Sequence, residues 1–117
     1  MRYKLLLYSA ADAGPAAGSP EQAAEMPAWF AFSQALVDAG AMLGGDPLHP
    51  IETATTVRVR DGEIVSTDGP FAETKELLGG YYMIDVPDLD AALAWAAKVP
   101  LAPYGSVEVR PVMDLPG

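Results

Sequence analysis

The chain has 117 residues, half of them hydrophobic, which is enough for one domain with a real core. It contains no cysteine, so disulfides, thiolate metal sites and cysteine nucleophiles are excluded. A formal net charge of −9, without a Lys/Arg cluster, argues against nucleic acid and anionic membranes as partners. No apolar run approaches the roughly 18 residues of a membrane span. We therefore expect a single cytoplasmic domain over residues 1–117.

The first forty residues predict a strand and a helix. Residues 2–8 alternate between apolar and mixed side chains, as in a strand with one buried face. Ser19 is typical of a helix cap, but Pro27 lacks a backbone donor, so we expect a short turn over 20–25, a kink or a restart, and a main helix that ends at Gly40. The buried stripe of this helix is expected to contain Met26, Trp29, Phe30, Ser33, Leu36 and Val37.

A β-hairpin is the most definite element of the sequence. A weaker strand is expected over residues 41–48, its glycines indicating a bend or bulge, and a β-branched strand over 55–60 leads into Asp61-Gly62. This dipeptide is the strongest short signal for a type I′ turn, which needs positive φ at both central residues. A two-residue turn fixes the register: Arg60 opposite Glu63, Val59 opposite Ile64, and Arg58 opposite Val65.

The last third of the chain predicts a turn followed by three further elements. Asp68-Gly69-Pro70 is a turn, after which one helical turn over 71–77 is expected to end at Gly79-Gly80. The remaining elements are expected in this order: a strand over 81–86, a helix over 89–99 capped by Asp88, and a strand over 106–112.

The order of these elements indicates the fold class. Without the hairpin they run β-α-β-β-α-β, the split βαβ arrangement of ferredoxin-like α+β folds, with both helices on one face of an antiparallel sheet. The opposite face would carry apolar and aromatic residues among charges: Leu6, Tyr8, Tyr81 and Met83. Such a patch usually marks an interaction surface, so we expect a second copy of the chain to cover it in a homodimer.

The stretch Thr67–Glu76, TDGPFAETKE, followed by GGYYMIDV at 79–86, resembles the YCII-related family, specifically its DGPF branch. The resemblance implies a dimeric α/β barrel of ferredoxin-like subunits, with a cleft for a small organic ligand between sheet and helices. In YCII-type relatives, a histidine of the first helix and a nearby aspartate are the proposed catalytic pair. Spacing to Ala31-Phe32 would put that histidine at Trp29, and an indole can stack on a ring but cannot transfer a proton.

Two residues are candidates for acid–base chemistry. His49 is the only histidine and the only side chain that normally titrates near neutrality. Asp68 would be held in place by its turn, although Asp before Gly often serves the turn alone. Ligand contacts are expected from Trp29, Tyr8, Tyr81, Phe71 and Glu73, with core or dimer packing, or a solvated surface for Glu73, as the alternative. No residue pattern indicates a metal or a cofactor.

Two functions are compatible with these residues. The first is a cofactor-free enzyme that moves a proton on a small organic molecule, with Asp68 as acid or base and His49 or a tyrosine as its partner. The second is a non-catalytic protein that senses a metabolite or contacts a regulatory partner. The resemblance adds extracytoplasmic-function sigma factor systems as that partner, because DGPF relatives are often encoded beside them. A cleft filled by the protein's own side chains would support neither.

Overall fold

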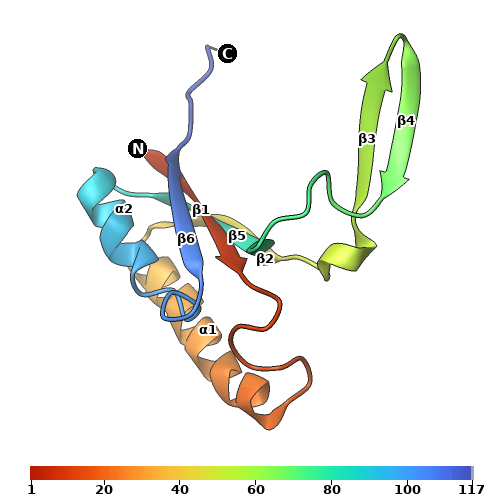
Figure 1. Ribbon diagram of the computed structural model, residues 1–117. Coiled ribbons are helices and arrows are strands. Elements are labelled where there is room, and N and C mark those ends of the chain that lie inside the picture. Colours follow the sequence, from red (N-terminus) through yellow and green to blue (C-terminus); the bar gives the residue numbers. More distant parts are fainter. Residues whose placement is uncertain (117) are drawn as a thin grey trace.

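The computed structural model describes residues 1–116 and consists of a four-stranded antiparallel sheet, two helices that cover one of its faces, and a separate hairpin (Figure 1). The main sheet contains β1 (Arg2–Ser9), β2 (Met42–Pro47), β5 (Leu77–Asp85) and β6 (Ser106–Pro111). The other elements are α1 (Pro20–Asp38), the 3-10 turn η1 (Ile51–Thr53), β3 (Thr55–Arg60), β4 (Glu63–Asp68) and α2 (Leu89–Ala96). The strand order β2-β5-β1-β6 is that of a split βαβ unit, so the predicted α+β, ferredoxin-like fold is confirmed.

The core lies between the sheet and the two helices. On β1, Tyr3, Leu5 and Leu7 are buried and alternate with half-exposed neighbours, as the sequence pattern predicts. Leu36 of α1 and Ile84 of β5 are completely inaccessible to solvent. Because β1 pairs with both β5 and β6, its apolar face lies at the centre of this core.

Helix α1 is continuous from Pro20 to Asp38, so the expected separate turn over 20–25 and restart at Pro27 are wrong (Figure 1). Ser19 accepts a hydrogen bond from the Gln22 backbone N–H at 3.1 Å, as its role as N-cap requires. Pro27 deprives the Ala23 carbonyl of its helical donor, but both residues are exposed and water can satisfy that oxygen. Within residues 1–116, neither α1 nor any other helix has the length and apolarity needed to cross a membrane.

The buried stripe of α1 also differs from the expected one. Phe32 and Leu36 are the buried residues of this helix, and Phe32 was not predicted to be buried. Phe30 and Val37 were predicted to be buried, but their exposed fractions are 69% and 54%. Trp29 is partly buried and packs against the core. The helix is therefore rotated by about one residue position relative to the predicted stripe, and the Phe30 side chain is free to face a cavity rather than the core.

The predicted helical turn over 71–77 is wrong. Residues 71–76 are irregular, and Gly79-Gly80 lies inside β5 instead of ending a helix. Strand pairing accounts for this, because β5 already pairs with β1 from Leu77 onward. The pairing continues past a β-bulge near Gly79. The second helix is also shorter than expected and ends at Ala96, where bonds from Lys98 and Val99 to residues three positions earlier tighten the chain.

Strands β3 and β4 form a hairpin, here called the arm (residues 55–68), that extends away from the sheet and helices (Figure 1). Its register is the predicted one, with Arg60 opposite Glu63, and both turn residues have positive φ, 53° at Asp61 and 76° at Gly62. The arm belongs to a separate two-stranded sheet. One of its faces is apolar and exposed, with Val57, Val59 and Ile64 at 60%, 59% and 76%.

Candidate ligand-binding site

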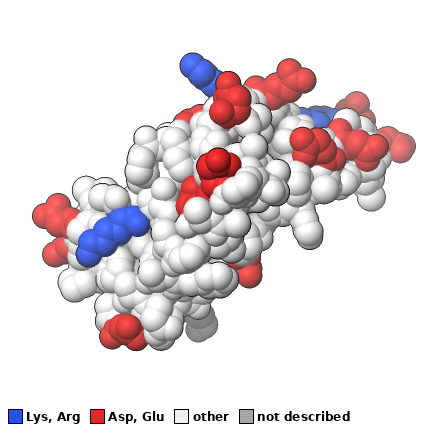
Figure 2. All heavy atoms as spheres, turned by 90° about the horizontal axis from the view of Figure 1, so that it is seen from below, with Lys and Arg blue, Asp and Glu red and all other residues white. Residues whose placement is uncertain are grey.

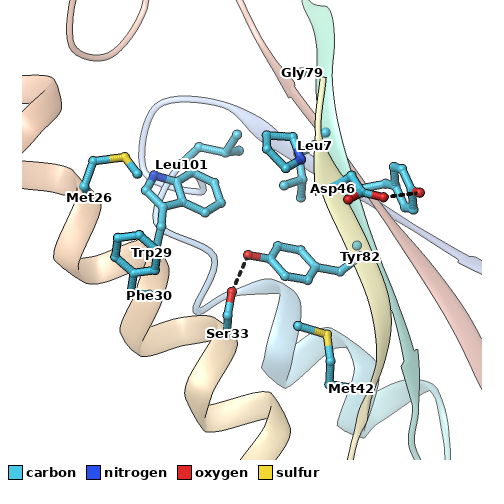
Figure 3. A pocket seen from close by; sticks show the side chains of 14 residues that line it. Leu7, Met26, Trp29, Phe30, Ser33, Met42, Asp46, Gly79, Tyr82 and Leu101 are labelled. Atoms are coloured by element: carbon cyan, nitrogen blue, oxygen red, sulfur yellow. Dashed lines mark hydrogen bonds between the residues drawn. The ribbon is translucent and has the colours of Figure 1, made fainter. Parts of the chain in front are cut away.

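The main cavity lies between α1 and the end of the sheet formed by β2 and β5 (Figure 3). A side cavity adjoins it and is lined by α1, the loop before α1 and Tyr104. The main cavity has a volume of about 380 Å³, and the side cavity about 300 Å³. Met26, Trp29 and Gly79 line both of them. The main cavity is otherwise lined mostly by apolar and aromatic side chains, with Leu7 and Leu101 among them. Its size and lining are those of a site for a small organic molecule.

A hydroxyl pair joins the two walls of the main cavity. Tyr82 reaches from β5 toward α1, where its hydroxyl oxygen lies 2.9 Å from Ser33 Oγ (Figure 3). The Tyr82 ring is held by an edge-to-face contact with Phe32, at 5.2 Å between ring centroids and 78° between planes. This packing fixes the position of the two hydroxyl groups, which can donate to or accept from a ligand.

A carboxylate connects the aromatic wall of the main cavity to the side cavity. Glu25 Oε1 accepts hydrogen bonds from Trp29 Nε1 and from the Tyr104 hydroxyl, each at 2.8 Å. Glu25 and Trp29 are four residues apart on α1 and therefore lie on the same face. Burial of Tyr104, together with its hydrogen bond to Glu25 and the charge of that residue, raises the pKa of Tyr104 to about 12. The Tyr104 hydroxyl thus stays protonated and keeps donating to Glu25.

Glycines allow the backbone to pass close to two parts of the site. A Cβ on Gly45, whose φ is 157°, would lie 2.7 Å from the Tyr81 carbonyl oxygen, so only glycine lets β2 approach β5 here. A Cβ on Gly14 would fall on the Tyr104 ring. The loop before α1 consequently packs directly on Tyr104 and holds its hydroxyl toward Glu25.

A second carboxylate, Asp46 of β2, lines the main cavity. Its Oδ2 accepts a hydrogen bond from the Tyr81 hydroxyl at 2.9 Å, and this bond raises the pKa of Tyr81. Figure 3 shows Asp46 on the side of the strands that faces away from Trp29. Asp46 therefore belongs to the rim at the sheet edge, whereas Glu25 and Ser33 belong to the helix side.

The structure brings only some of the predicted site residues together. Trp29 and Tyr81 line the main cavity. Tyr8 lies on the open face of the sheet, where burial and the nearby Glu108 raise its pKa. The other predicted contacts and both acid–base candidates are exposed and line neither cavity: Phe71, Glu73, His49 and Asp68. Their roles stay predictions.

Several residues of the site were missed in the sequence. Glu25 carries a usable signal, because a carboxylate four residues before a tryptophan on a helix can accept from its indole nitrogen. Tyr104 lies in the loop before β6, and no local pattern indicates that it meets α1. Among residues 1–116, no three His, Cys, Asp or Glu side chains are grouped to hold a metal ion.

The family model for the YCII-related domain matches residues 1–116. The chain belongs to the YCII-related family. This YCII-related chain is 39% identical over 114 residues to an uncharacterised protein of Rhizobium meliloti (strain 1021), a match that covers 96% of the chain and 92% of that protein.

A solved structure shares the fold of this YCII-related chain. It is 5-chloro-2-hydroxyhydroquinone dehydrochlorinase (TftG) of Burkholderia phenoliruptrix AC1100, in complex with 2,5-dihydroxybenzoquinone. The TM-score is 0.53 at 14% identity, and the match covers 97% of this chain and 94% of the other. The likeness supports the ferredoxin-like architecture, since identity at this level shows the fold alone.

Proposed function

We propose that this YCII-related protein binds a small, ring-shaped organic molecule in the main cavity. The observation that carries the proposal is the open, mostly apolar cavity of about 380 Å³, with the Trp29 indole on its α1 wall and the Ser33–Tyr82 hydroxyl pair joining that wall to β5. A planar ring would contact the indole face, and a polar substituent would reach the hydroxyl pair. The fold neighbour, whose structure is a complex with a quinone, is consistent with such a ligand.

Fluorescence of Trp29 tests this proposal. The chain has two tryptophans, and Trp95 lies outside both cavities, against Phe32. In a Trp95→Phe variant, Trp29 is the remaining indole, and we expect saturable quenching or a spectral shift when a panel of substituted phenols and quinones, starting with hydroquinone, is titrated in. A panel that leaves the Trp29 signal unchanged throughout would overturn the proposal.

A matched pair of variants on α1 places the ligand. Phe30 and Val37 are both exposed, but Phe30 lines the main cavity and Val37 does not. Phe30→Ala should therefore weaken binding of any panel member that quenches Trp29, while Val37→Ala should leave its affinity unchanged. Equal effects of the two substitutions would place the ligand elsewhere.

Turnover is a separate part of the proposal. Asp68 as acid or base, with His49 or a tyrosine as partner, would make the protein a cofactor-free enzyme, and product analysis with each bound panel member tests it. Binding without turnover, as in a ligand sensor, is the second candidate, favoured by the indole of Trp29 where the resemblance puts a histidine. Asp68→Asn separates the two, because loss of turnover with unchanged ligand affinity supports the enzyme. A sigma factor as regulatory partner stays a prediction.

We further infer a homodimer and membership of the DGPF branch. The motif Asp68–Phe71 supports the branch assignment. The dimer is supported by the exposed apolar face of the arm and by the open face of the sheet, where Leu6, Tyr81 and Met83 are only partly covered. The chain is only 19 Å thick in its shortest dimension, one sheet and one helix layer, so a second copy would bury a face that the fold itself leaves open.

A further inference from the structure

We propose that Glu25 is the polar anchor of the ligand site, and that the site selects a ring bearing a hydrogen-bond donor, such as a phenolic hydroxyl, over the same ring without one. This inference rests on the proposed function, because it concerns what the ligand of the two adjoining cavities must carry.

The hydrogen bonds of Glu25 leave one oxygen available. Trp29 Nε1 and the Tyr104 hydroxyl both donate to Oε1 at 2.8 Å. Within residues 1–116 no group donates to Oε2, although Glu25 is partly buried and lines the side cavity. A carboxylate has about four acceptor positions, so two donors on one oxygen do not saturate it. Oε2 is thus a free acceptor on a carboxylate that lines the side cavity, one helical turn from Trp29, which lines both cavities.

The charge of the residues that line the cavities favours a ligand with a hydrogen-bond donor over an anionic ligand. Neither cavity is lined by Lys, Arg or His among residues 1–116, and Glu25 and Asp46 are their charged residues. In the whole sequence Asp and Glu outnumber Lys and Arg by 16 to 7. Figure 2 shows broad uncharged surface on the face seen from below, with acidic side chains gathered toward the end that carries the arm. A carboxylate ligand would find no counter-charge, whereas a hydroxyl group would find an acceptor.

Glu25 also has a structural role that the test must separate from ligand binding. Its hydrogen bond holds the Trp29 indole in the wall of the main cavity. Loss of that bond would disturb every ligand that contacts the indole, regardless of its substituents. If the ligand contacts Glu25 directly, the affinity lost in a Glu25→Gln variant depends on whether the ligand carries a donor, whereas a lost support for the indole weakens binding with or without one.

The experiment compares hydroquinone with 1,4-dimethoxybenzene, which keeps the ring and both oxygens but has no donor. We expect wild-type protein to bind hydroquinone more tightly, and Glu25→Gln to lose about tenfold in hydroquinone affinity, the loss typical of a hydrogen bond to a charged group. Its affinity for the dimethyl ether should change much less. Glu21→Gln removes the same charge from the first turn of α1 and should leave the preference intact.

A second variant keeps the test decisive if Glu25→Gln unfolds. Tyr104→Phe removes one donor from Oε1 but leaves the Glu25 carboxylate, so the preference for hydroquinone should persist. If Glu25→Gln lowered the affinity for both ligands equally, the inference would be overturned and Glu25 would be only a support for Trp29. Equal wild-type affinity for both ligands would overturn it as well, with the proposed function intact. If no member of the phenol and quinone panel binds, both proposals fail.

Discussion

Ser33 Oγ lies 2.9 Å from the Tyr82 hydroxyl oxygen, so one side-chain hydrogen bond joins α1 to β5 beside the main cavity. Ser33→Ala and Tyr82→Phe should each lower the free energy of unfolding by about 1 kcal/mol, the usual net value of such a bond. The double variant should lose less than the sum of the two, because either change already removes the bond. Denaturant unfolding of all four proteins measures this coupling, and strictly additive losses would contradict it.

Tyr104 should make stability depend on alkaline pH. Its pKa is raised from 10.0 to about 12, so the folded state keeps the proton over a range in which the unfolded chain loses it. The associated stability is fully present below pH 10 and is lost as the pH rises toward about 12. Because Tyr104 is only partly buried, solvent screening reduces the size of this effect.

The comparison that isolates Tyr104 is wild type against Tyr104→Phe. The pKa values of Tyr8 and Tyr81 are raised too, so the wild-type pH profile alone would combine three groups. Unfolding free energies should fall more steeply between pH 10 and about 12 in wild type than in the variant. Parallel profiles would show that Tyr104 ionises in the folded protein as it does in the unfolded chain.

Leu36 and Val37 are neighbours on α1 that should respond very differently to truncation. Leu36 is completely buried, so Leu36→Ala should lower the free energy of unfolding by about 2–5 kcal/mol, through lost burial and the space left behind. Val37 is 54% exposed, and Val37→Ala should change the free energy of unfolding by no more than about 0.5 kcal/mol. Thermal or denaturant unfolding measures both, and similar losses would contradict the orientation of the helix.

The apolar face of the arm should hold two copies together. Ile64 is 76% exposed on that face, whereas Thr67 lies on the opposite face of the same strand. We expect wild type to sediment at twice the chain mass of 12.3 kDa, Ile64→Glu to sediment at 12.3 kDa, and Thr67→Glu to stay dimeric. Wild-type protein that sediments as a single chain at micromolar concentration would contradict the dimer.

Most of the fold is predictable because its signals are local. The Asp61-Gly62 turn sets the register of the arm through backbone dihedrals alone, and the alternation in residues 2–8 shows which face of β1 is buried. Capping by Ser19 is equally local. The segment 71–77 was mispredicted because β5 begins at Leu77, which pairs with Ser9 of β1, far away in the sequence, and residues 71–76 form the irregular connection to it.

The site was less predictable because its contacts join residues that are far apart in the sequence. Trp29 and Tyr81 could be named from the sequence because aromatic residues near a proposed cleft are obvious candidates. The Tyr104–Glu25 contact spans 79 positions, and nothing in either local pattern records it. A rotation of α1 by one position also decides whether Phe30 or Phe32 faces the core, and alternative stripes of similar apolarity leave that choice to tertiary packing.

The isolation of the arm from the main sheet has an evolutionary consequence. Residues 55–68 pair only with one another, and neither cavity draws a lining residue from them. Substitutions there, other than at Asp68, can alter which molecules associate while the residues that line the cavities beside α1 stay the same. Proteins with this fold can therefore change how their subunits assemble and which small molecules they bind independently of each other, through substitutions in separate parts of the chain.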